Sequence, residues 1–112
     1  IPVFGEGKLM RDFTYIDDIV DGIIASLQKS NGRNAIFNLG HHKPYSISEL
    51  ISYLETLLKK KATIEFLPTP PGDVHITYAD VSKSKSVLNF DPKVDLKEGL
   101  SYFIKWYQKQ YS

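Results

Sequence analysis

The stretch that decides the fold is "KLMRDFTYIDDIVDGIIASL", residues 8–27, because a charged and aromatic segment leads directly into a helix pattern. The apolar side chains of this pattern recur at helical spacing and predict one buried face; they are Ile19, Val20, Ile23, Ile24 and Leu27. Asp17 or Asp18 is suited to cap the start of this helix, since an Asp carboxylate accepts free backbone N–H groups there. Asn31–Gly32 predicts where it ends.

Arg11 lies at the start of this stretch and leaves two interpretations open. It could pair with Asp12 or Asp17 on the surface, which would make the cluster of charge a matter of local structure only. Alternatively, Arg11 faces an anionic ligand, because a guanidinium presents a fork of donors that fits phosphate oxygens. The residues of this stretch alone do not decide between the two.

A second helix is predicted from the capping-box pattern of Ser46 and Glu49. Its apolar stripe comprises Ile47, Leu50, Ile51, Leu54, Leu57 and Leu58. Residues 59–61 are three lysines, which suit the negative end of a helix and are interpreted as a solvated terminus.

Two more helices are expected near the end of the chain. Asp80 is predicted to cap a short helix that runs through Leu88, and Asp95 with Glu98 forms another capping-box pattern. The last helix has an apolar stripe of Leu96, Leu100, Phe103, Ile104 and Tyr107. Trp106 lies beside it and could cover core surface or meet a partner.

Short strands are predicted between the helices, at residues 1–4, 13–16, 35–40 and 63–68. "PTPPGD", residues 68–73, must be a loop, because three prolines remove backbone donors and fix φ. Helices interleaved with short strands indicate an α+β protein or a piece of an α/β protein. The chain holds too few βαβ units for a parallel sheet to be expected.

The bulk composition excludes several classes of protein. A net charge of +1, from 14 basic and 13 acidic residues, gives no general attraction to nucleic acid or to an anionic membrane. There are no cysteines, so disulfides and thiolate metal sites are excluded. The absence of cysteines allows a reducing compartment without proving one, and our expectation is a cytoplasmic protein. The longest apolar runs are far shorter than a membrane span. The chain begins at Ile1 inside a strand pattern, so we expect a piece of a longer protein.

Catalytic and cofactor motifs are missing from the sequence. There is no G-x-x-G-x-x-G dinucleotide loop, no Walker loop, no nucleophile elbow and no Tyr-x-x-x-Lys pair. His41, His42 and His75 lack metal-ligand spacing with carboxylates, and two adjacent histidines on a strand would point apart. The sequence therefore predicts no catalytic residues, no metal and no cofactor site of its own.

Three segments together resemble one family. They are "PVFGEGKLMRDFTYIDDIVDGI" (2–23), "FNLG" (37–40) and "PPGDVHITYADVSKSKSVLNFDPKVDLKEGL" (70–100). In this order they resemble the C-terminal part of nucleotide-sugar epimerases and dehydratases, which are extended short-chain dehydrogenase/reductase proteins. They are most similar to the UDP-glucuronate 4-epimerase branch. The resemblance implies that residues 1–112 are a single substrate-binding subdomain of a Rossmann-type α/β enzyme, whose N-terminal domain lies outside this chain.

The resemblance also implies roles for individual residues. Arg11 matches the arginine that contacts the nucleotide diphosphate, and Asp73 matches a position that accepts from ribose hydroxyls. Pro2 and Phe4 match the strand that flanks the base, with edge-strand packing as the alternative, and Asn38 matches a position near the sugar nucleotide. In many 4-epimerases, the residue two before the glycine of P-G-D is Arg or Gln and helps to hold the phosphates. Here it is Pro70, which has no donor.

The function implied by the resemblance is to hold a UDP-sugar while the missing half transfers hydride. The parent would be an NAD-dependent epimerase that oxidises the sugar at C4, lets the keto-sugar rotate and reduces it on the other face. NAD and the catalytic Tyr/Lys pair would belong to that half, so this chain alone is expected to be inactive. The same binding role in a dehydratase or reductase, and a free-standing nucleotide-sugar-binding module, are the alternatives. A homodimer is one further partner to consider.

Overall fold

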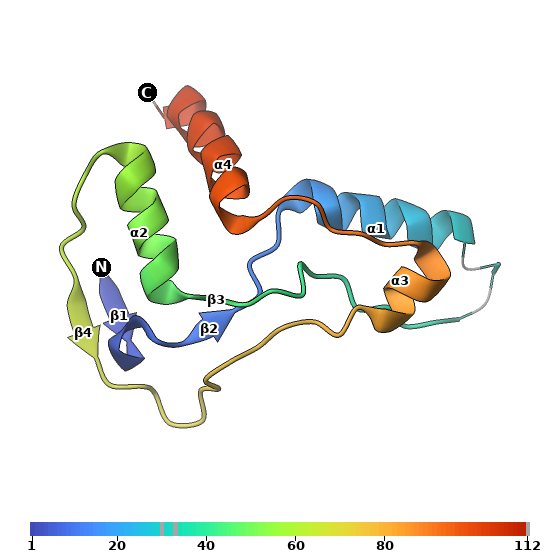
Figure 1. Cartoon of the computed structure of the whole chain (residues 1–112), viewed down its shortest axis with the longest axis horizontal. Helices are drawn as coiled ribbons and strands as arrows, with labels where there is room; N and C mark the ends of the chain where they lie inside the picture. The colour runs from blue at the N-terminus through green and yellow to red at the C-terminus, as the bar shows by residue number, and fades with distance from the viewer. Residues whose placement is uncertain (30, 33, 112) are drawn as a thin grey trace.

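The computed structural model describes residues 1–29, 31–32 and 34–111. Along the described residues the elements are β1 (Pro2–Phe4), the 3-10 turn η1 (Gly5–Gly7), β2 (Met10–Arg11), α1 (Ile16–Lys29), β3 (Tyr45–Ser46), α2 (Ile47–Leu58), β4 (Glu65–Leu67), α3 (Ser82–Leu88) and α4 (Leu96–Tyr111), and Figure 1 shows how the helices and strands are arranged. The strands, α2 and α4 form one part of the molecule, and α1 with α3 extends from it as an arm (Figure 1). None of the helices in the described part of the chain combines the length and apolarity that crossing a membrane requires.

The strands form two small sheets. β1 pairs with β4 in parallel, with Val3 opposite Phe66, and β2 pairs with β3 in antiparallel, with Arg11 opposite Tyr45. The expectation that this chain could not form a parallel sheet is wrong for β1 and β4, because the long connection between them, which passes through β2, α1, β3 and α2, brings them side by side. The strands predicted at residues 1–4 and 63–68 are confirmed in their central residues.

Two other predicted strands do not form among the described residues. Residues 13–15 belong to no strand and have no ladder partner, and Ile16 already begins α1. Residues 35–40 likewise have no ladder partner, although Phe37 and Leu39 pack on the core while Ile36 is 83% exposed. Burial alternates along residues 36–39 but not along 13–15, and a strand also needs a neighbouring backbone to bond to.

The core of the arm lies between α1 and the segment around α3. Val81, Leu88 and Phe90 are buried there, and Phe37 and Leu39 pack against them. Gly22 of α1 permits this close approach, since a Cβ at that position would lie 2.7 Å from the Leu39 methyl groups.

Asp18 plays a different part from the predicted helix cap. Its side chain is buried, with 4% of the residue exposed, and its carboxylate oxygens accept the backbone N–H groups of Lys93 and Val94 at 3.0 Å each. α1 begins before it, at Ile16. A sequence pattern identifies a carboxylate that suits backbone donors but does not say which donors, and here they come from a distant loop. Asp18 therefore fixes the segment before α4 onto α1.

The helix signals downstream are largely confirmed. At α2, the Ser46 hydroxyl accepts from the Glu49 N–H at 3.1 Å and the Glu49 carboxylate accepts from the Ser46 N–H at 2.8 Å, which completes the capping box. α3 runs to Leu88 as predicted, but its N-cap residue is Val81 and not Asp80; the Asp80 carboxylate accepts from the N–H of Ser82, the first helical residue, at 3.0 Å from one position further out. At α4, Asp95 accepts from the Glu98 N–H, but the Glu98 carboxylate accepts from the Tyr102 hydroxyl instead of completing a second box.

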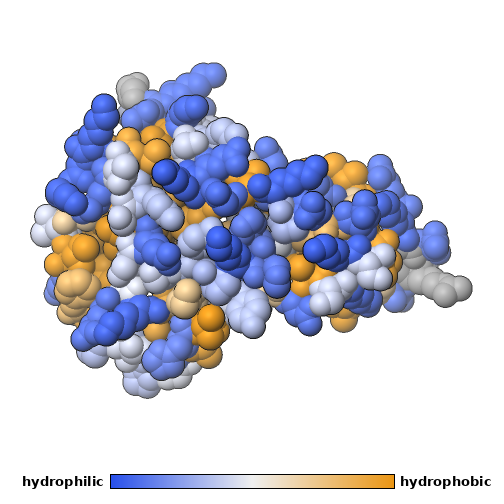
Figure 2. Space-filling model, in the orientation of Figure 1, coloured by the Kyte–Doolittle hydropathy of each residue, from blue (hydrophilic) through white to orange (hydrophobic). Residues whose placement is uncertain are grey.

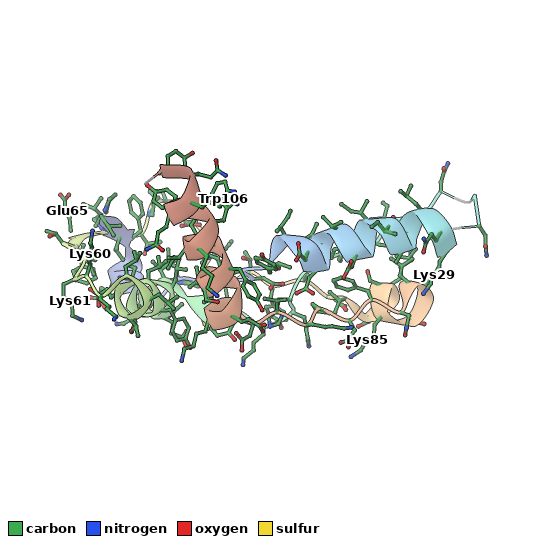
Figure 3. All side chains as sticks on the ribbon, turned by 90° about the horizontal axis from the view of Figure 1, so that it is seen from above. Lys29, Lys60, Lys61, Glu65, Lys85 and Trp106 are labelled. Atoms are coloured by element: carbon green, nitrogen blue, oxygen red, sulfur yellow. The ribbon has the colours of Figure 1, made fainter. Side chains whose placement is uncertain are left out.

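The lysines after α2 mark its end, as predicted. Lys59 takes the left-handed conformation (φ 53°) that closes the helix, and Lys61 pairs with Glu55 at 2.8 Å. Lys60 and Lys61 project at the edge of the molecule in Figure 3.

Many apolar side chains remain uncovered. Along α1 the predicted apolar face is exposed by 42% at Val20, 48% at Ile23 and 79% at Leu27. Figure 3 shows side chains along α1 that point away from α3, and Figure 2 shows hydrophobic surface on the arm and over the β1–β4 edge. On α4, Trp106 is 51% exposed and packs edge-on against Tyr111. The predicted buried stripes are thus apolar faces that this chain covers only in part.

Candidate functional site

Arg11 is held in place by three hydrogen bonds. One guanidinium nitrogen donates to the carbonyl oxygens of Met10 at 2.8 Å and Val74 at 3.0 Å, and the other donates to Asp73 Oδ1 at 2.8 Å. β2 positions its backbone by pairing with β3. The side chains of Arg11 and Asp73 are 28% and 32% exposed, so the pair is partly shielded yet open to a ligand.

The loop at residues 68–73 positions Asp73. A turn brings the Asp73 N–H to the Pro70 carbonyl oxygen at 3.2 Å, and Gly72 supplies the positive φ of 83° that this turn needs. Asp73 Oδ1 accepts both from Arg11 and from the Val74 N–H at 2.9 Å. Within the described residues no hydrogen bond uses Asp73 Oδ2, so this oxygen is free to accept from a ligand.

A hollow of about 330 Å³ lies beside Arg11. The residues that line it come from β2 and the residues after it, from the segment between α1 and β3, and from the segment between β4 and α3: Arg11, Asp12, Thr14, Leu39, Gly40, Thr77, Tyr78 and Ala79. The hollow thus combines the Arg11 cation with hydroxyl groups and small side chains, and both oxygens of its one carboxylate, Asp12, are occupied by backbone N–H groups. Such a surface suits an anionic, hydroxylated ligand.

The alternative pairing of Arg11 with Asp12 or Asp17 does not occur in the part of the chain that the structure describes. The Asp12 carboxylate instead accepts backbone N–H groups of His41, His42 and Ala79, at 3.1, 3.1 and 2.9 Å. Arg11 is paired with the distant Asp73 rather than with a neighbour in sequence.

Asn38 lies next to the hollow without lining it. Its side-chain amide donates to the Asp80 carbonyl oxygen at 3.3 Å, and its own carbonyl oxygen accepts from the buried Ser84 hydroxyl. The Ser82 hydroxyl and N–H lower the pKa of Asp80, so that this carboxylate stays ionised at the start of α3. In this structure Asn38 connects residues 37–40 to α3, and its neighbours Leu39 and Gly40 reach the hollow.

Pro2 and Phe4 lie on β1, at the other end of the loop. They flank the buried Val3 and are exposed themselves, Phe4 by 39%. Phe4 is in register with Leu67, the last residue of β4 before the loop that ends at Asp73. A second hollow of about 490 Å³, lined by Gly5, Phe66 and Thr69 among others, lies beside this register pair. The loop at 68–73 therefore runs from Leu67, which lies opposite Phe4, to Asp73, which pairs with Arg11.

The "GEG" segment differs in structure from a dinucleotide loop. Gly5–Gly7 is a 3-10 turn that leads from β1 toward the short strand β2. A dinucleotide loop leads from a strand into a helix whose N-terminus faces the phosphates. Of the described residues, no group of three or more His, Cys, Asp or Glu side chains is arranged to hold a metal ion.

Sequence reasoning missed three features of this site. The sequence suggests Asp12 only as a possible partner for Arg11, and it assigns no part in the site to the Val74 carbonyl or to residues 77–79. One sequence signal was available for Asp12: side chains of consecutive residues on a strand point to opposite sides, so Arg11 and Asp12 could not both serve the same contact.

Comparison with known proteins places the chain in a family. The model of the family described as GDP-mannose 4,6 dehydratase matches residues 1–103. The chain belongs to this family. The predicted resemblance to nucleotide-sugar epimerases and dehydratases is thereby confirmed, as is the interpretation of the fold as a piece of a Rossmann-type α/β protein.

Relatives within the family include several epimerases. UDP-glucuronate 4-epimerase from Thermodesulfobacterium geofontis is 47% identical over 107 residues, which cover 95% of this chain and 32% of that protein. UDP-glucuronate 4-epimerase 5 from Arabidopsis thaliana is 40% identical over 120 residues, which cover 96% and 28%. The crystal structure of UDP-glucuronic acid 4-epimerase from Bacillus cereus with UDP-glucuronic acid and NAD matches at 38% identity and a TM-score of 0.86, and covers 98% of this chain and 35% of that one. The chain spans about a third of the length of the curated relatives it matches.

Proposed function

We propose that this chain is the nucleotide-sugar-binding part of an NAD-dependent UDP-sugar 4-epimerase, with UDP-glucuronate as its substrate. The observation that carries the proposal is the direct contact between Arg11 and Asp73, which are far apart in sequence and meet beside one hollow. The Bacillus cereus relative, whose structure holds UDP-glucuronic acid, supports the choice of sugar nucleotide.

The donor count of Arg11 fits a diphosphate contact. A guanidinium has five N–H donors, and the three hydrogen bonds described above use three of them. Two donors remain, which is the number that a bidentate contact with phosphate oxygens requires. Because Met10, Val74 and Asp73 already fix the guanidinium, little side-chain entropy is left to lose when a ligand binds.

Asp73 would hold the ribose from the same place. Its Oδ2 is unused by the described residues, and an ionised carboxylate only accepts, so it suits ribose hydroxyls and would repel phosphate. Phe4 and Pro2, at the other end of the loop, would flank the base, and Asn38 would lie toward the sugar. Pro70 brings no donor to the phosphates, so Arg11 would carry this contact for the loop as well.

The residues of this chain do not fit NAD. The sequence has no glycine-rich dinucleotide loop, and the Gly5–Gly7 turn leads toward a strand. NAD and the catalytic pair would therefore be held by the other two thirds of the parent protein, and this chain alone would position substrate without turning it over.

The exposed apolar face of α1 is the surface that we assign to contact with the rest of the parent protein, because single-domain proteins rarely leave such a face uncovered. We place the parent in the cytoplasm, with a homodimer as its assembly.

A dehydratase is the second candidate. The matching family model carries the description of a GDP-mannose 4,6 dehydratase, and the same Arg11 and Asp73 contacts would serve in such an enzyme. Calorimetric titration of the chain with UDP, GDP and dTDP separates a UDP-sugar enzyme from a dehydratase that takes a GDP- or dTDP-sugar; a UDP-sugar dehydratase would differ in the catalytic half. We expect UDP to bind most tightly. Preference for GDP would transfer the proposal to a dehydratase, and the absence of binding to all three nucleotides would refute a nucleotide-sugar site.

A further inference from the structure

We propose that Asp12 is a positioning residue of the nucleotide-sugar site: its carboxylate ties together the two chain segments that line the hollow with Arg11. This inference rests on the proposed function, because the hollow beside Arg11 is taken as the ligand site. It assigns to Asp12 a role that involves no contact with ligand.

The contacts of Asp12 reach both segments at once. Oδ1 accepts the N–H of His41, and Oδ2 accepts the N–H groups of His42 and Ala79. His41 and His42 directly follow Gly40, and Ala79 ends the stretch 77–79, so the bonds lie at the ends of the two lining segments. His41, His42 and Ala79 lie outside any strand, so no neighbouring strand accepts their N–H groups. The Asp12 carboxylate accepts these N–H groups instead.

Thr14 strengthens the same junction. Its hydroxyl oxygen accepts from the His41 N–H at 3.0 Å, and it lies within 3.3 Å of the Asp12 carbonyl oxygen, to which it donates. The N–H of His41 is thus shared between two acceptors, and residues 12–14 hold residues 41–42 as a unit.

The junction is packed without spare room. A Cβ on Gly40 would lie 2.6 Å from Asp12 Oδ2 and 2.7 Å from the Ala79 Cβ, both closer than real side chains approach. Gly40 has no positive φ that would require glycine, so the close approach of the Asp12 carboxylate accounts for this residue. The three segments therefore meet at one point, and a change on either side of it moves the walls of the hollow.

Arg11 and Asp12 are adjacent in sequence but contact different segments of the chain. Arg11 points to the loop with Asp73 and Val74, and Asp12 points to residues 41–42 and 79. The segment at 75–77 is bound separately, since the Met10 N–H donates to the His75 carbonyl oxygen and the Thr77 N–H donates to the Met10 carbonyl oxygen. Loss of the Asp12 carboxylate would release the far ends of both walls while Arg11 and Asp73 stay paired.

Asp12→Asn is the main test, because both oxygens of Asp12 accept and an amide must turn its NH₂ toward a backbone donor. We expect calorimetry to show UDP binding weakened about tenfold or more, the size of one charge-assisted hydrogen bond. Amide hydrogen exchange should become faster at His41, His42 and Ala79. Gly40→Ala approaches the same junction from the other side and should weaken UDP binding as well, which keeps the test open if Asp12→Asn does not fold.

Asp18→Asn is the matched control. Asp18 is also a carboxylate that accepts backbone N–H groups from a distant loop, but it lies away from the hollow. We expect both Asp18→Asn and Asp12→Asn to lower the melting temperature. Asp18→Asn should leave the UDP dissociation constant within about twofold, because the residues that Asp18 holds, Lys93 and Val94, do not line the hollow.

The outcomes separate this inference from the proposed function. If the unmodified chain binds UDP and Arg11→Ala weakens binding, but Asp12→Asn and Gly40→Ala leave it unchanged, the positioning role is refuted and the proposed function stands. If Asp18→Asn weakens UDP binding as much as Asp12→Asn, the effect is one of general stability and the positioning role is again refuted. If the unmodified chain does not bind UDP, both proposals fail together.

Discussion

Arg11 Nη2 and Asp73 Oδ1 lie 2.8 Å apart although 62 positions separate the two residues in the chain. Arg11 comes from β2 and Asp73 from a proline-rich loop. The turn at Pro70–Asp73 positions Asp73, and the Val74 carbonyl oxygen fixes the Arg11 guanidinium beside it. A surface ion pair of this kind contributes little stability by itself. Under the proposed function, the pair instead presents a cation and an acceptor side by side to the ligand.

Removal of the Arg11 guanidinium is expected to weaken nucleotide binding. Arg11→Ala should cost about 1.5–3 kcal/mol in the binding free energy of UDP, the usual value for hydrogen bonds to a charged group. The binding free energy of UDP for Arg11→Lys should lie between the values for Arg11→Ala and the unmodified chain, because lysine keeps the positive charge and loses the fork of donors. Titration calorimetry gives these values. Lys8→Ala is the control, since Lys8 is an exposed cation that pairs with Glu6; equal losses in the Lys8 and Arg11 variants would point to general charge attraction.

Asp73 is expected to recognise the ribose. The unmodified chain should bind UDP better than 2′,3′-dideoxy-UDP by about 1.5–3 kcal/mol, because a carboxylate accepting from a hydroxyl is a charge-assisted bond. In Asp73→Asn this difference should shrink to about 1 kcal/mol or less, as the acceptor is then neutral. Asparagine retains an oxygen for the Val74 N–H and so keeps the turn. A difference that is the same in both proteins would remove Asp73 from the ribose site.

The capping box of α2 should be measurable as stability. Ser46→Ala removes the acceptor for the Glu49 N–H and is expected to lower the free energy of unfolding by about 1 kcal/mol. Chemical denaturation followed by circular dichroism measures the change. Ser52→Ala is the control, because Ser52 lies on the exposed side of the same helix and alanine is a better helix former. Equal stability of Ser46→Ala and the unmodified chain would mean that the box contributes nothing.

The apolar face of α1 is expected to cause self-association of this chain at high concentration. Leu27→Glu places a charge on that face, where Leu27 is 79% exposed, and should lower the average mass in light scattering. Gln28→Glu adds the same charge at an exposed residue one position along and should leave the mass higher. If Leu27→Glu has no effect on a chain that associates, another surface is responsible.

The sequence predicted helices and turns better than strands, for a physical reason. The capping box of Ser46 and Glu49 and the proline loop are local, so the residues that decide them are adjacent. Residues 35–40 have the alternation of a strand, but their pairing depends on a partner that sequence cannot locate. The parallel pair of β1 and β4 was unexpected for the same reason, since it joins segments about 60 residues apart.

In the candidate site, too, the sequence could identify individual residues but not the contacts that depend on distant segments. The family motif identified Arg11 and Asp73, and the structure brings them into contact. Neither the motif nor the residue pattern revealed that Asp12 binds His41, His42 and Ala79, because those contacts depend on how three separate segments fold together. For Asp18, the sequence indicated an acceptor of backbone N–H groups and assigned it the wrong donors.

The most direct test of the central claim is to map UDP onto the chain by NMR titration with assigned backbone and arginine side-chain resonances. The account predicts the largest shift changes at the Arg11 side chain and the Asp73 and Val74 amides, with smaller changes at residues 77–79, and their loss in Arg11→Ala. Saturable UDP binding that shifts resonances of α2 or α3 and leaves those of Arg11 and Asp73 unchanged would contradict it.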